Sequence, residues 1–151
     1  MKVIESVKNI LIEQVGSYRV LLDLLQKERE HLLSLRVSEV EHISKEKDTI
    51  VLRLRLLEDE RLRLMKKLPT EAGVGCDMSL KGLSEFTGDD TFQSIRLQLL
   101  SLLQGIRDMN GFNRAIIERS LTAVRNTLFF LEPFDRRGNH TQKGTLLSKE
   151  A

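Results

Sequence analysis

The sequence predicts an all-α protein: an antiparallel helical hairpin with a long third helix packed alongside and a flexible C-terminal tail. Three observations support this elongated, coiled-coil-like bundle. Apolar residues recur at steps of three and four through three long stretches, which is the period of helices. Leu, Glu, Arg and Lys dominate, whereas aromatic residues make up only 5% and Trp is absent. A chain of 151 residues fits a single domain.

The first predicted helix covers residues 2–35. An apolar or aromatic residue returns every seven positions, as in helices that pack through a seam. Gln14 and Glu28 interrupt this pattern with polar side chains. The residues of the repeat are Ile4, Leu11, Tyr18, Leu25 and Leu32.

The second predicted helix covers residues 39–67 and ends before Pro69. Ser38 followed by Glu41 has the spacing of a capping box, so Ser38 is the expected N-cap. Lys47 and Arg61 interrupt its apolar seam. The short break between two long amphipathic helices favours an antiparallel hairpin, and the alternative is one continuous helix of about 65 residues. The seam consists of Val40, Ile43, Ile50, Leu54, Leu57, Leu64 and Leu68.

The connection over residues 69–89 is rich in glycine and contains the single cysteine, Cys76, interpreted as an incidental thiol. A short helical turn is predicted at 79–86. The third helix is predicted over 90–131, with Asp90 and Gln93 as its cap. After Pro133 the composition becomes polar, which predicts a flexible tail over 133–151.

The C-terminal half of the third helix carries two apolar strips, and a two-helix hairpin would not obviously bury both. Asn110 and Asn113 lie among these apolar positions, where they either bond to a partner or face solvent. The alternative for the strips is a wide core face or a homodimer interface. Arginines at 96, 107, 114 and 125 form a solvated margin or a rim facing acidic groups of a partner. The predicted partner-binding residues are Met109, Asn110, Phe112, Asn113, Ile116, Ile117, Leu121, Val124, Leu128, Phe130 and Leu131.

Charge and motifs argue against several other classes of protein. The net charge is only +2 and no basic block is present, so no nucleic-acid partner is expected. The start of the chain lacks the apolar segment of a secretory signal, and no apolar run is long enough for membrane insertion, so a cytoplasmic protein is expected. Two Glu-x-x-His motifs, Glu28–His31 and Glu39–His42, have the spacing of di-iron ligands, but they are interpreted as solvated charges near helix ends. No catalytic residue, metal site or cofactor is predicted.

Several short segments together resemble the FlgN-type flagellar export chaperones, over residues 18–138. They are the stretch 21–30 of the first helix, Lys47 and Arg61 in the second, Asn110-Gly111-Phe112-Asn113 in the third, and Phe134-Asp135-Arg136-Arg137-Gly138 after Pro133. The family often has Tyr where this chain has Phe134.

The resemblance implies a non-enzymatic cytoplasmic chaperone. Such proteins bind the C-terminal helical segments of hook–filament junction proteins, prevent premature assembly and deliver these proteins to the export gate. The resemblance also implies that the third helix binds substrate. It implies that the segment with Phe134, Asp135, Arg136 and Gly138 contacts the gate or folds on the substrate. The alternative is a structural coiled-coil subunit that self-associates through the same surface and has no export role.

Overall fold

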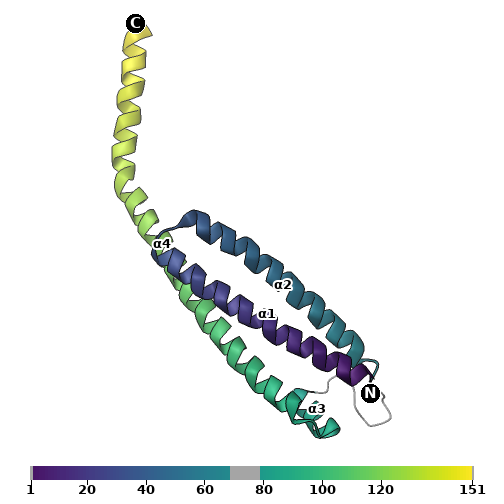
Figure 1. The fold of residues 1–151 in the computed structure, drawn as a ribbon. Coiled ribbons are helices and arrows are strands. Elements are labelled where there is room, and N and C mark those ends of the chain that lie inside the picture. Colours follow the sequence, from purple (N-terminus) through teal and green to yellow (C-terminus); the bar gives the residue numbers. More distant parts are fainter. Residues whose placement is uncertain (1, 69–78, 151) are drawn as a thin grey trace. The chain divides into compact units, whose positions relative to one another are not determined.

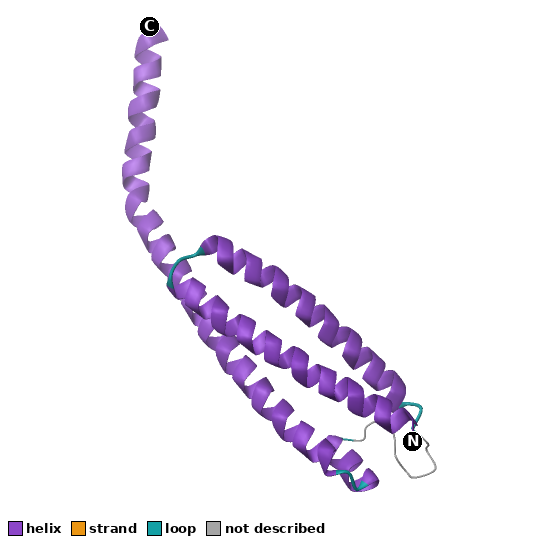
Figure 2. Cartoon of the chain, in the orientation of Figure 1, coloured by secondary structure: helices purple, strands orange, loops and turns teal. Residues whose placement is uncertain are grey.

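The computed structural model describes residues 2–68 and 79–150, with side chains described up to residue 132. Every regular element in these residues is a helix, which confirms the predicted all-α fold (Figures 1 and 2). The chain forms two compact units: unit 1 is Met1–Asn113 and unit 2 is Arg114–Ala151. The helices are α1 (Lys2–Leu33), α2 (Val37–Met65), α3 (Leu80–Thr87) and α4 (Asp90–Glu150), and α4 contributes to both units.

The helices α1 and α2 form the predicted antiparallel hairpin, so the chain does not continue as one helix (Figure 1). Leu35 ends α1 in a left-handed conformation with φ 55°, and the next amide, of Arg36, donates to the carbonyl of His31 at 2.9 Å. The predicted cap at Ser38 is wrong. The turn at Leu35 leads directly into α2, which begins at Val37 after Arg36 and has no side-chain cap.

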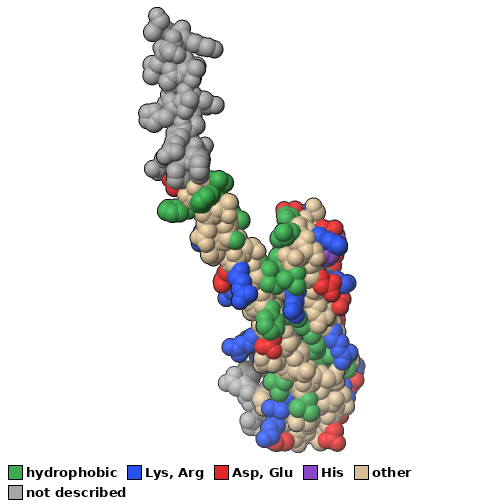
Figure 3. All heavy atoms as spheres, turned by 90° about the vertical axis from the view of Figure 1, so that its left-hand side faces the viewer, with side chains coloured by type: hydrophobic (Ala, Val, Ile, Leu, Met, Phe, Trp, Pro, Cys, Tyr) green, Lys and Arg blue, Asp and Glu red, His purple; other side chains and the backbone are tan. Residues whose placement is uncertain are grey.

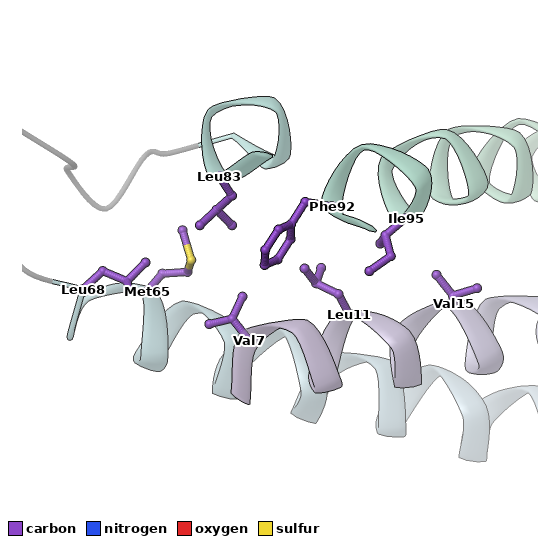
Figure 4. Close-up of a cluster of buried hydrophobic side chains, with 8 residues drawn as sticks. All are labelled: Val7, Leu11, Val15, Met65, Leu68, Leu83, Phe92 and Ile95. Atoms are coloured by element: carbon purple, nitrogen blue, oxygen red, sulfur yellow. The ribbon is translucent and has the colours of Figure 1, made fainter. Parts of the chain in front are cut away.

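A first core cluster lies where α1, the end of α2, α3 and the start of α4 meet (Figure 4). Phe92 at the start of α4 is fully buried and lies at the centre of this group. Burying a side chain of this size stabilises a fold by about 1.5–3 kcal/mol, so this contact holds α4 against the hairpin. The cluster consists of Val7, Leu11, Val15, Met65, Leu68, Leu83, Phe92 and Ile95.

A second core cluster lies farther along unit 1 and joins α1, α2 and α4 through Leu21, Leu25, Leu54 and Ile106. A Cβ atom built on Gly105 would lie 3.3 Å from Leu22, so glycine permits a close approach of α4 to α1 here. The part of α4 that belongs to unit 1 therefore packs alongside the hairpin, as the sequence predicts.

The helix α3 fulfils the prediction of a short helical turn before the third long helix. The Ser79 hydroxyl accepts a hydrogen bond from the amide of Gly82, and Gly88 ends α3 with φ 66°. The predicted cap of α4 at Asp90 is wrong by one residue. The carboxylate of Asp89 accepts the amide of Thr91 at 2.9 Å, because the turn at Gly88 brings Asp89 over the first turn of the helix.

The helical backbone of α4 continues to Glu150, whereas the sequence predicted an end near residue 131. Pro133 therefore lies inside the helix, where it has no N–H to donate to the carbonyl of Phe129. The flexibility predicted for residues 133–151 stays a prediction.

Candidate functional site

Three polar residues from the apolar sides of α1, α2 and α4 meet inside unit 1. The side-chain amide of Asn113, which is 2% exposed, donates to the carbonyl of Leu25 at 3.0 Å and to Oε1 of Glu28 at 2.9 Å. The ammonium group of Lys47 forms an ion pair with the other carboxylate oxygen of Glu28. This network joins α1, α2 and α4, and the Oδ1 atom of Asn113 has no hydrogen-bond partner within the described part of the chain.

Sequence reasoning missed this network, although each member was noticed. The sequence shows Glu28 and Lys47 as polar interruptions of two apolar repeats, and Asn113 as a polar residue on the apolar side of the third helix. The signal that could have joined them is the opposite charge of Glu28 and Lys47 at positions that a hairpin brings together. The side-chain NH2 group of Asn113 therefore donates its hydrogen bonds within the chain.

A second polar layer joins α1 to α2. The amide of Gln14 donates to Oε2 of Glu58 at 3.0 Å, and the guanidinium group of Arg61 bonds to both oxygens of the same carboxylate. The hydrogen bond from Arg61 lowers the pKa of Glu58, whereas burial raises the pKa of the nearby Tyr18. Because each polar residue needs its partner, the two layers select one register of the hairpin.

The predicted site residues in unit 1 occupy different environments. Met109 is half-buried against the second core cluster, whereas Asn110 is exposed. Phe112 is 55% exposed, and the guanidinium carbon of Arg29 lies 5.5 Å from the centre of its ring. A hollow of about 410 Å³ lies beside these residues, lined by Gln26, Arg29, Glu30, Leu33 and Met109.

The predicted site residues in unit 2 are exposed, apart from the half-buried Ile116. Figure 3 shows hydrophobic side chains gathered on this helix next to the segment drawn in grey. Phe129, which the sequence did not select, is 78% exposed and helps to line a hollow of about 620 Å³. The exposed fractions are 43% for Ile117, 49% for Leu121, 55% for Val124, 62% for Leu128, 70% for Phe130 and 47% for Leu131.

Five of these residues form one stripe, here called the seam, because steps of four, three, four and three bring side chains back to the same side of a helix. Burying a Leu or Ile completely contributes about 1.5–3 kcal/mol, so covering these half-exposed side chains would contribute on the order of 5 kcal/mol. Helical packing against a partner is therefore the interaction that this surface supports best. The seam consists of Ile117, Leu121, Val124, Leu128 and Leu131.

The two Glu-x-x-His motifs do not converge within the described residues. Glu28 belongs to the network with Lys47 and Asn113, and His42 lies 2.8 Å from Glu46, one turn along α2. Among residues 2–68 and 79–132, no three His, Cys, Asp or Glu side chains are arranged to hold a metal ion. Within the described chain, no helix has the length and apolar character needed to cross a membrane.

Two other predictions concern residues without a description. Cys76 lies outside the described residues, as do the side chains of Phe134, Asp135 and Arg136. The backbone at these three positions and at Gly138 belongs to α4.

Comparison with known proteins identifies a family for this chain. No curated protein and no solved structure matches the chain. The family model described as FlgN protein matches residues 1–147. This match covers both units, including the exposed seam of α4.

Proposed function

The chain belongs to the FlgN family of flagellar export chaperones, and on this premise we propose that its seam binds the C-terminal helical segments of hook–filament junction proteins. Bound in this way, those segments stay soluble and cannot assemble prematurely. The chaperone acts in the cytoplasm and delivers its cargo to the flagellar type III export gate. It has no catalytic role in this proposal.

The observation that carries the proposal is the exposure of the seam. Both core clusters of unit 1 are complete without it, because the last residues of α4 that pack in them are Ile106 and Met109. Five aliphatic residues on one side of a helix are a costly surface to leave in water and suit an amphipathic partner helix. Asn110, Phe112 and Ile116 would contact the same cargo, and the buried Asn113 would support the adjoining turn of α4.

The segment after Pro133 has a separate proposed role. We propose that Phe134, Asp135, Arg136 and Gly138 contact the cytoplasmic domain of the export gate. The proposal rests on the likeness of this segment to the family motif. A chain shortened after Glu132 should then bind cargo normally but fail to associate with the gate.

The test of cargo binding is Val124→Asp, compared with Asn126→Asp as a matched control. Both positions are exposed, and they lie on opposite sides of α4, since two residues correspond to about 200° of rotation. Both variants are co-expressed with a junction protein and purified through it. Val124→Asp should weaken binding at least tenfold while leaving the melting temperature of the free chaperone unchanged, and Asn126→Asp should bind normally.

Two results would contradict the proposal. One is normal binding by Val124→Asp. The other is unfolding of the free chaperone by this substitution, which would identify Val124 as a core residue. Deleting the C-terminal segment of the junction protein should also abolish the complex.

A second candidate is a structural subunit that self-associates through the same residues. The heptad spacing of the seam favours it, because two copies of such a helix can pair as a coiled coil. Analytical ultracentrifugation of the purified chain distinguishes the two candidates. A dimer that dissociates when cargo is added is compatible with a chaperone, whereas a dimer that excludes cargo at every concentration supports the structural subunit.

A further inference from the structure

The two edges of the seam differ in charge. Glu118 and Arg125 lie seven residues apart, so both fall on the same edge of the stripe, next to Ile117 and Val124. The opposite edge carries Ser120 instead, followed one heptad later by Thr127. A partner helix lying on the seam therefore meets one charged edge and one uncharged edge.

The side-chain charges of Glu118 and Arg125 are not paired within the described chain. Glu118 and Arg125 are both exposed, and neither side chain forms an ion pair or a hydrogen bond with another described residue. The hydroxyl of Thr122 donates to the backbone carbonyl of Glu118 at 2.9 Å, a bond that does not involve the Glu118 carboxylate. Both charged groups are therefore available to a partner.

We infer that the seam recognises an amphipathic cargo helix with a basic residue facing Glu118 and an acidic residue facing Arg125, one heptad apart. This inference rests on the proposed function and specifies the chemistry of its cargo. A slip of the cargo by one heptad would place its acidic residue against Glu118 or its basic residue against Arg125. Because like charges then meet, the pair also selects one register, which the aliphatic stripe alone does not.

The test compares Arg125→Glu with Arg119→Glu. Each substitution changes the net charge by the same amount at an exposed position, but Arg119 lies on the side of α4 away from the seam. Binding of each purified full-length hook–filament junction protein is measured by calorimetry at 50 and 300 mM salt. Arg125→Glu should weaken binding at least fivefold at low salt, and Arg119→Glu less than twofold.

The difference in binding between Arg125→Glu and Arg119→Glu should become smaller at 300 mM salt, because salt screens charge contacts at an exposed edge. Glu118→Lys should weaken binding as Arg125→Glu does. Equal effects of Arg125→Glu and Arg119→Glu would overturn the inference, because only net charge would then matter. The inference would also be overturned if Arg125→Glu and Arg119→Glu both bind as tightly as the unmodified chain.

Failure of the inference can be separated from failure of the proposed function. If Val124→Asp abolishes binding while Arg125→Glu and Arg119→Glu behave alike, only the charge recognition is wrong. If Val124→Asp binds normally, or if neither junction protein binds the unmodified chain, the proposed function is wrong and the inference falls with it. One further result would overturn the inference. If the unmodified chaperone is a dimer at the concentration of the titration and the Arg125→Glu variant is a monomer, the partner of the charged edge is a second copy of this chain.

Discussion

Replacing Asn113 by Ala tests whether the buried polar network holds α4 against the hairpin. The substitution removes two donated hydrogen bonds, one to the carbonyl of Leu25 and one to the carboxylate of Glu28. It leaves Glu28 and Lys47 paired with each other. The expected result is a less stable unit 1 with its helices intact.

The size of the effect follows from these contacts. A hydrogen bond to a neutral group contributes about 0.5–1.5 kcal/mol, and one to a charged group about 1.5–3 kcal/mol. Losing both from Asn113 would cost about 2–4.5 kcal/mol. The Oδ1 atom has no hydrogen-bond partner in the described chain, so removing it returns about 1–3 kcal/mol. The net loss should be about 1 kcal/mol, or roughly 2–4 °C in melting temperature for a chain of this size.

The measurement is urea unfolding of the full chain, followed by circular dichroism at 222 nm. Asn110→Ala is the matched control, because it removes the same side chain one turn earlier at an exposed position. This control should change the free energy of unfolding by less than about 0.5 kcal/mol. Equal effects of the two substitutions would refute the reasoning, because burial of the Asn113 amide would then have no energetic consequence.

Two further substitutions test the turns of unit 1. Leu35→Gly should raise the free energy of unfolding, measured in thermal melts, by about 0.5–1 kcal/mol. Glycine accepts φ 55° without strain, and the Leu35 side chain is 78% exposed, so its removal costs little packing. The control Leu33→Gly, within α1, should lower the free energy of unfolding. The hydrogen bond from Lys8, at 2.7 Å, and the amide of Thr91 hold the pKa of Asp89 well below its usual range. The resulting stabilisation is present above the unfolded pKa of about 3.9 and is lost as the pH falls. Asp89→Asn should therefore be less stable than the unmodified chain at pH 7, with a deficit that shrinks below about pH 4, and a constant deficit across this range would contradict the assignment.

Helical period and charge pattern were enough to predict much of this protein. The stretches of α1, α2 and the first part of α4 followed from apolar spacing, because that spacing is a local property of the chain. The short break between the first two stretches favoured the hairpin over one continuous helix. Helix ends were less predictable. Ser38 has the right residue type for a cap, but the left-handed turn at Leu35 begins α2 before it. Asp90 was one residue away from the actual cap, Asp89.

The sequence by itself determined where apolar stripes and polar interruptions lie, because both are read from residue spacing. Only the tertiary structure decided which of them face each other. Asn113 and Glu28 are 85 positions apart, and only packing of α4 on α1 brings the amide to the carboxylate. The seam from Ile117 to Leu131 has the same periodicity as the buried stripes of unit 1, yet its side chains are about half exposed. A 3.6-residue period places apolar residues on one side of a helix, whereas burial depends on whether another helix covers that side.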